Sequence, residues 1–228
     1  MERQKGQLLY EGKAKKLYEV VGRPQEVWVE YKDSLTAFNA QKKSNFAGKG
    51  SINAGITDIL YRRLAQEGIA THFIGSVGPI DQICAKVKII PLEVVTRNRL
   101  AGSTAKKLGR EEGTTIREPL VEFYYKDDAL GDPFISDDQA LLMEAVPNRG
   151  TLDDLKQQAL RVNQVLRQIF ASVGLELIDF KLEFGWTPEG KLVLAVEISP
   201  DTCRLWDMKT GEKLDKERFR RALGRVEE

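Results

Sequence analysis

The chain has 228 residues, of which 42% are hydrophobic and 30% charged, a balance that excludes a disordered protein and suits one large domain or two small ones. The formal net charge of +1 gives no bulk electrostatic reason to expect binding to nucleic acid or to a membrane surface. No apolar run approaches the roughly 20 residues that cross a bilayer, and the polar start of the chain lacks a signal peptide's apolar segment, so we expect a cytoplasmic protein.

The residue types that most often carry metal or nucleophilic chemistry are scarce in this chain. It has one histidine, His72, and two isolated cysteines, Cys84 and Cys203. This excludes zinc fingers, HExxH sites and most histidine-based triads. We expect reduced, packed thiols and a structural His72, so the chemistry must come from carboxylates, lysines, arginines and hydroxyl groups.

The first part of the chain is predicted to be rich in strands. Strands are expected over residues 8–20 and 27–31, with turns at Gly12 and residues 22–24. A helix is expected over residues 51–67, capped by Ser51 and ended by Gly68. Its expected apolar stripe consists of Ile52, Ile56, Ile59, Leu60 and Leu64.

Strands and helices mix after this point. Residues 87–96 predict a buried strand region with Pro91 at an edge or bulge, and residues 121–125 another strand. Helices are expected over residues 100–108, 151–173 and 218–226, the second opening on a capping-box variant that starts at Thr151. Residues 175–186 and 191–199 predict a hairpin. This order of elements indicates an α+β fold.

The predicted strand at residues 175–184 carries the most informative pattern. Alternate residues of a strand share a face, so Asp179, Lys181 and Glu183 lie on one face, opposite an apolar one. Such a face is either a solvated surface with ion pairs or the wall of a cleft that holds a metal ion and a reacting carboxylate. Mg²⁺ would suit the second interpretation, because it binds carboxylates together with substrate phosphates.

Three other segments gather charges that could bind anions. Residues 199–207 contain a turn that would present Asp201, Arg204 and Asp207, although an ordinary turn with a surface ion pair has the same pattern. Lys13 and Lys15 follow Gly12 on one side of the expected strand and could hold nucleotide phosphates, or form a plain basic strand edge.

A phosphomonoester site is indicated where two arginines precede the expected helix at residues 100–108. Arg97, Arg99 and Ser103 surround its start, and guanidinium groups and helix N-termini both favour phosphate. Further along, residues 126–133 form a charged loop, which could bind metal or substrate or simply cap turns.

Six segments, in this order and spacing, resemble the SAICAR synthetase family over nearly the whole chain. They read YEGKAK at 10–15, GKG at 48–50, PLEVVTRNR at 91–99 with GS at 102–103, KDD at 126–128 with DP at 132–133, DFKLEFG at 179–185, and SPD at 199–201 with RLWD at 204–207. The resemblance implies an α+β SAICAR synthetase-like fold of two lobes, related in layout to ATP-grasp enzymes. The lobes would be residues 1–86, rich in β-structure, and residues 87–228, with an ATP cleft between them.

The resemblance also implies the reaction. An ATP-dependent ligase would join L-aspartate to carboxyaminoimidazole ribonucleotide through an acyl phosphate, giving SAICAR, ADP and phosphate in purine biosynthesis. ATP would be the co-substrate and Mg²⁺ the metal. The partners would be these small molecules, not nucleic acid or membrane, and the enzyme would be a homodimer.

Site roles carried over from the resemblance fall into four groups. The expected catalytic residues are Asp179, Lys181 and Asp201, and Glu183 is the expected metal ligand. The expected nucleotide contacts are Lys13, Ala14, Lys15, Lys86, Val87, Lys88 and Ile89. The expected ribonucleotide contacts are Arg97, Ser103, Lys126, Asp128, Asp132 and Arg204.

The chain departs from the family's pattern at Val196, where an aspartate implicated in metal binding is usual, and the given sequence stops at Glu228, where the family usually continues in a longer final helix. Glu197, Asp179 or water could compensate for the missing carboxylate. Two alternatives stay open. Another carboxylate–amine ligase would not need the Arg97, Ser103 and Arg204 group, and a nucleotide-binding regulator would lack turnover.

Overall fold

The computed structural model describes residues 2–37, 42–45 and 47–214. The chain forms two compact units. Among the described residues, the first contains those up to Lys88 and the segment Trp186–Ser199, and the second contains Ile89–Gly185 and residues 200–214. Each unit is built around its own five-stranded antiparallel sheet.

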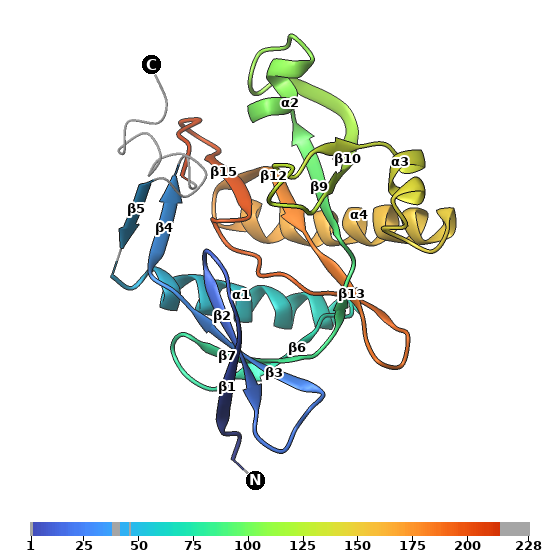
Figure 1. Ribbon diagram of the computed structural model, residues 1–228. Coiled ribbons are helices and arrows are strands. Elements are labelled where there is room, and N and C mark those ends of the chain that lie inside the picture. Colours follow the sequence, from blue (N-terminus) through green and yellow to red (C-terminus); the bar gives the residue numbers. More distant parts are fainter. Residues whose placement is uncertain (1, 38–41, 46, 215–228) are drawn as a thin grey trace. The chain divides into compact units, whose positions relative to one another are not determined.

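The sheet of the first unit has the strand order β1-β2-β3-β7-β6 (Figure 1). These strands are β1 (Lys5–Glu11), β2 (Lys15–Val20), β3 (Glu26–Tyr31), β6 (Phe73–Ser76) and β7 (Asp81–Ala85). Two short strands, β4 (Ser34–Ala37) and β5 (Lys42–Asn45), pair with each other. The core of this unit includes Val29, Tyr31, Ala54 and Cys84.

Helix α1 (Lys49–Gln66) begins two residues earlier than predicted. Its N-cap is Gly48, which has a φ of 85°, and Ser51 instead donates from its hydroxyl to the Gly48 carbonyl, so the expected Ser51 cap is wrong. Part of the expected stripe is wrong too, because Ile52 and Ile59 are exposed. The buried face is more polar than predicted and consists of Gly50, Asn53, Ala54, Thr57, Leu60, Tyr61 and Leu64.

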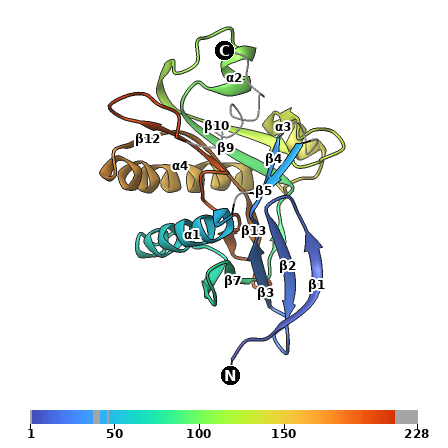
Figure 2. The same cartoon turned by 90° about the vertical axis from the view of Figure 1, so that its left-hand side faces the viewer.

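The sheet of the second unit has the order β11-β10-β9-β12-β15. Its strands are β9 (Leu92–Arg99), β10 (Thr115–Tyr125), β11 (Phe134–Ile135), β12 (Leu175–Leu182) and β15 (Cys203–Asp207). Helix α4 (Arg149–Ser172) runs along this sheet and packs on β12 and β9 (Figure 2). Two short helices complete the unit, α2 (Gly102–Lys107) and α3 (Asp137–Leu142).

The predicted long helix is present, but its cap is not the predicted one. The side chain of Asn148 accepts a hydrogen bond from the Thr151 amide, and α4 starts at Arg149, so the capping box at Thr151 is wrong. Leu155, Val162 and Leu166 are fully buried, as the helical spacing predicts.

The chain passes between the units in short strands. These are β8 (Lys88–Ile89) and β13 (Phe184–Trp186). The expected boundary between residues 86 and 87 lies close to the first of these crossings, between Lys88 and Ile89. The expectation, however, placed every residue after 86 in one lobe. The segment Trp186–Ser199 groups with the first unit because β14 (Leu192–Leu194) hydrogen-bonds there: the His72 amide donates to the Leu194 carbonyl at 2.9 Å.

Several simpler expectations can be compared directly with the structure. Cys84 and Cys203 are buried free thiols, as predicted. No described helix is long and apolar enough to cross a membrane. The expected helix at residues 218–226 lies outside the described residues. An ATP-grasp layout and an ATP cleft between lobes stay predictions.

Candidate active site

Asp179 lies at the centre of a buried charge cluster in the second unit. Strand register sets Asp179 of β12 opposite Arg97 of β9 on one side and Arg204 of β15 on the other. Both arginines donate from Nη1 to Asp179 Oδ2, each at 2.6 Å. Three predicted site residues from distant parts of the sequence are therefore brought together by the order of three strands.

All three nitrogens of the Arg97 guanidinium group donate hydrogen bonds within the protein. Its Nε donates to Glu122 Oε2 at 2.6 Å and its Nη2 to the Tyr124 hydroxyl at 3.1 Å, in addition to the bond with Asp179. Burial opposes the charge, but Asp179, Glu122 and Tyr124 outweigh it and raise the pKa of Arg97. Arg97 therefore orders its neighbours, and its expected contact with the ribonucleotide stays a prediction.

Arg204 is the more accessible arginine of this cluster, with 27% of its side chain exposed against 5% for Arg97. Its Nη2 would lie only 2.6 Å from a Cβ at position 102, where Gly102 has a φ of +59°. Glycine is therefore needed there on both steric and conformational grounds. The next residue, Ser103, is exposed in the first turn of α2.

A second cluster of lysines and carboxylates lies at the end of β12 and just after it. Lys181 forms an ion pair with Glu93 of β9, and its Nζ lies 3.4 Å from Glu183 Oε1. The other oxygen of Glu183 lies 3.0 Å from Lys126 Nζ. Glu183 is buried, so the interpretation of this face as a plain solvated surface is wrong.

This geometry also bears on the expected metal ligand. Each carboxylate oxygen of Glu183 is next to a lysine ammonium, so a cation would have to displace one of the two lysines. The structure has no group of three or more His, Cys, Asp or Glu side chains placed to hold a metal within its described ranges. One buried carboxylate still fits Mg²⁺, because this ion takes one or two carboxylates and completes its shell with phosphates and water.

The loop after Lys126 is ordered by its own aspartates. Asp127 accepts hydrogen bonds from the amides of Ala129 and Leu130, and Asp132 accepts one from the Asp127 amide at 2.9 Å. Asp132 also has a positive φ of 49°. These bonds give Asp132 a turn-stabilising role, whereas the expected substrate contacts of Asp128 and Asp132 stay predictions.

In the first unit the expected nucleotide residues are arranged differently from the prediction. Lys15 begins β2, but Lys13 lies in the connection between β1 and β2, so the expectation that both share a strand face is wrong. The physical reason is the tight turn that starts at Gly12, whose amide donates to the Lys15 carbonyl at 2.8 Å. Lys13 is exposed, whereas Lys15 pairs with the buried carboxylate of Glu197.

The position of the unusual Val196 is next to this pair. Val196 is buried, and its carbonyl accepts a hydrogen bond from the hydroxyl of Tyr61, a buried residue of α1. Glu197 is buried as well, and its negative charge helps burial to raise the pKa of the Tyr31 hydroxyl. The carboxylate that could compensate for Val196 therefore already has Lys15 as a partner.

The remaining predicted residues lie on short connecting segments. Residues 86–89 lead into and include β8; Lys86, Lys88 and Ile89 are exposed and Val87 is half-buried, and the Lys86 amide donates to the Gln25 carbonyl. Asp201 lies in the turn before β15. Asp207, considered earlier as part of this turn, caps the backbone amides of Lys209 and Thr210, which lowers its pKa.

Sequence reasoning missed the carboxylates that hold these cations. Glu93, Glu122 and Glu197 each pair with a lysine or arginine of the expected site. Glu93 had a detectable signal, because it shares a strand face with Arg97 and interrupts an apolar run. The arrangement as a whole offers fixed cations and anions in partly dry surroundings, which suits the stabilisation of charge that develops on phosphate or carboxylate oxygens.

Comparison with known proteins gives a consistent result. The SAICAR synthetase family model matches residues 8–228. The phosphoribosylaminoimidazole-succinocarboxamide synthase of Bacillus cytotoxicus is 55% identical over 99% of this chain and 93% of its own. A crystal structure of that synthase from Ehrlichia chaffeensis has a TM-score of 0.91 at 43% identity, covering 96% of this chain and 93% of its own. A SAICAR synthetase in complex with ADP has a TM-score of 0.89 at 45% identity, covering 94% and 91%.

Proposed function

The chain belongs to the SAICAR synthetase family and is an ATP-dependent ligase of purine biosynthesis, and on that premise we propose that it joins L-aspartate to carboxyaminoimidazole ribonucleotide. The observation that carries the choice of substrate is the group of Arg204, Gly102 and Ser103. It offers one accessible guanidinium and one exposed hydroxyl side by side, which suits the phosphate of a ribonucleotide.

The proposed reaction has two steps. An oxygen of the imidazole carboxylate attacks the γ-phosphorus of ATP, the bond to the β-phosphate oxygen breaks, and ADP leaves. The aspartate amine then attacks the carbonyl carbon of the acyl phosphate, loses a proton, and expels phosphate. Both steps depend on alignment and charge neutralisation, so neither needs a cysteine or histidine nucleophile.

In this proposal Arg204 and Ser103 bind the ribonucleotide phosphate and Arg97 acts as a positioning residue. Arg97 donates to Asp179, Glu122 and Tyr124, so it fixes the Asp179 carboxylate, to which Arg204 also donates. This revises the expected clamp, in which Arg97 itself was a phosphate ligand. Asp179 and Asp201 would then orient the substrate beside Arg204.

The lysine and carboxylate cluster on β12 would surround the reacting groups. Lys181 would neutralise the carboxylate under attack, and Lys126 would release Glu183 when it turns to the substrate. Mg²⁺ would supply charge neutralisation of the nucleotide phosphates when bound, with Glu183 as the ligand from the protein. Asp128 and Asp132 would shape the loop that carries Lys126.

Nucleotide binding is assigned to the first unit. Lys13 and Lys15 with the intervening Ala14 would contact the phosphates, and the segment of Lys86, Val87, Lys88 and Ile89 would contact the adenine. The ADP bound in a relative of 45% identity supports nucleotide use by this chain. Lys15 would have to exchange its partner Glu197 for a phosphate. A homodimer and a cytoplasmic location remain further proposals.

The test traces the carboxylate oxygen atoms of the ribonucleotide into the phosphate that is released. The ribonucleotide is labelled with oxygen-18 in its carboxylate and turned over with ATP, Mg²⁺ and L-aspartate, and the phosphate released is analysed by mass spectrometry. One labelled oxygen per phosphate is expected, because the carboxylate oxygen leaves with the phosphate. Unlabelled phosphate would contradict the acyl phosphate. ADP formation that ignores the ribonucleotide and aspartate would contradict the proposed substrates.

A further inference from the structure

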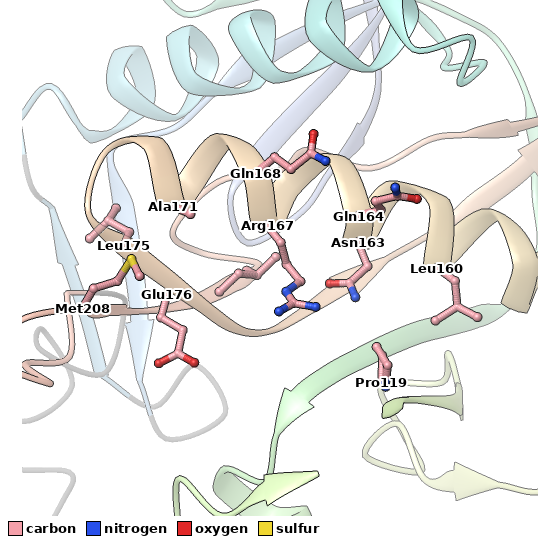
Figure 3. Close-up of a pocket in the computed structure, with 11 residues that line it drawn as sticks. Pro119, Leu160, Asn163, Gln164, Arg167, Gln168, Ala171, Leu175, Glu176 and Met208 are labelled. Carbon is pink, nitrogen blue, oxygen red and sulfur yellow. The ribbon is translucent and has the colours of Figure 1, made fainter. Parts of the chain in front are cut away.

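The second unit contains a pocket that none of the proposed catalytic residues lines. It has a volume of about 580 Å³ and lies between α4 and the strands β10 and β12. Figure 3 shows Asn163 and Arg167 extending from α4 toward the side on which Pro119 of β10 lies. The volume is in the range of about 300–1,000 Å³ that is usual for small-molecule sites.

Apolar side chains line both ends of this pocket, with Asn163 and Arg167 between them (Figure 3). Leu160 and Pro119 lie at one end, and Ala171 of α4, Leu175 of β12 and Met208 lie at the other. The exposed positions of Leu160 and Met208 leave apolar surface uncovered at the rim. Such a lining suits the body of an organic ligand and would not hold a bare inorganic ion.

Beside Arg167 the pocket opens into a smaller one of about 290 Å³ that is lined by arginines. The two pockets share Pro119, Arg167, Glu176 and Leu177, so they form one continuous depression. Arg99 and Arg117 join Arg167 in the smaller part, against Glu176 as the acidic side chain. Since Glu176 already pairs with Arg99 at 2.7 Å, the positive charge of Arg117 and Arg167 is left in excess.

The walls of this depression are fixed before any ligand binds. Asn98 and Asn163 exchange side-chain hydrogen bonds of 2.8 and 2.9 Å, and Asn98 also donates to the Leu177 carbonyl at 3.0 Å. These bonds tie α4 to β9 and β12. The opposite rim is a bulge in β10, because Thr115 pairs with Arg99 but the next pair is Leu120 with Arg97. A preformed site of this kind loses little entropy on binding.

We propose that this depression is a second ligand site, which binds a phosphate ester of an apolar, ring-sized body. The ring would lie against Ala171, Leu175 and Met208, and the phosphate would accept hydrogen bonds from Arg117 and Arg167, whose planar groups match phosphate oxygens. The site is separate from the Asp179 and Glu183 clusters, so its occupant is bound in addition to the substrates.

Phenyl phosphate is the smallest probe that combines a ring with a phosphate ester. Its binding can be followed by NMR at Met208, which lines the pocket. With methyl-¹³C-methionine in the full-length protein, phenyl phosphate should shift the Met208 methyl resonance saturably and leave Met143 unchanged. Phenol and inorganic phosphate, which each lack one half of the ligand, should bind at least tenfold more weakly. The shift should persist at saturating ADP.

Variants separate this site from the alternatives. The double variant Arg117→Gln/Arg167→Gln should lose the saturable shift, whereas the matched Arg161→Gln on the exposed side of α4 should keep it. Glu176→Gln should tighten binding, because it frees Arg99 and removes the one repulsive charge. The proposal is overturned if phenol binds as well as phenyl phosphate, if the double variant still binds normally, or if ADP abolishes the shift.

Discussion

Arg97 donates a hydrogen bond of 2.6 Å to Asp179, and each of these side chains exposes only 5% of its surface. Removing either partner of a buried ion pair is destabilising, because the remaining charge stays buried with less compensation: Asp179 would keep only Arg204 from this cluster, and Arg97 would keep Glu122 and Tyr124. The pair therefore couples the stability of the second unit to the geometry around Arg204. The first prediction depends on this coupling.

Arg97→Lys should lower the free energy of unfolding by about 1–3 kcal/mol, since a lysine cannot donate to Asp179, Glu122 and Tyr124 at once. Arg204→Lys is the matched control at the accessible arginine. It should leave stability nearly unchanged and raise the KM for the ribonucleotide more than that for ATP. Urea unfolding and steady-state kinetics on both variants measure this. Equal stability of the two variants would contradict the positioning role of Arg97.

Glu183→Gln should abolish most turnover, with kcat falling on the order of a hundredfold, and leave the fold intact. The substitution keeps the shape of the side chain but removes the charge that Lys126 and Lys181 share and that Mg²⁺ would need. Activity is measured against Mg²⁺ concentration, with the exposed Glu189→Gln as the control. A normal kcat with an unchanged Mg²⁺ midpoint in Glu183→Gln would remove this residue from the metal site.

Val196→Asp should destabilise the protein more in the absence of metal than in its presence. Val196 is buried beside Glu197, so a new carboxylate there adds a second negative charge and should reduce stability in the absence of Mg²⁺. With Mg²⁺ and ADP present the loss should be smaller, and Mg²⁺ should bind more tightly. Thermal unfolding with and without these ligands tests this. Equal destabilisation under both conditions would mean that position 196 does not reach the metal.

Lys15→Ala and Lys13→Ala should differ in kind. Lys15→Ala removes the ion pair that Lys15 forms with the buried Glu197 carboxylate and should cost about 1–3 kcal/mol of stability, and adding Glu197→Gln should recover part of that loss. Lys13 is exposed, so Lys13→Ala should keep stability and chiefly weaken ATP use. Unfolding curves and KM values for ATP distinguish the two. Wild-type rates in Lys13→Ala at every ATP concentration would exclude its phosphate role.

Cys84 should be inert toward thiol reagents in the folded protein. Burial raises the pKa of its thiol from the usual 9.0 to about 12, so almost no thiolate exists at pH 8. Because the folded pKa is raised, this group's stabilisation is complete below pH 9 and is lost as the pH rises toward 12. A disulfide exchange reagent at pH 8 should react only after urea is added. Rapid reaction of Cys84 without denaturant would show that this part of the core opens.

The sequence by itself determined the elements and the faces of the strands. Alternation in β12 put Asp179 and Lys181 opposite an apolar face, and the structure has this arrangement because a strand's side chains must alternate wherever one side is buried. Helical spacing likewise determined the buried positions of α4. These features are local, so a window of a few residues contains the information.

Only the tertiary structure decided the partners of these residues. Arg97 and Arg204 meet at Asp179 because β9 and β15 flank β12, and that strand order joins positions 107 residues apart, a separation that no local pattern encodes. The same holds for Glu197, whose distance from Lys15 in sequence hides their ion pair. It also holds for the start of α1, where the side chain of Asp33 accepts hydrogen bonds from the amides of Gly48 and Gly50.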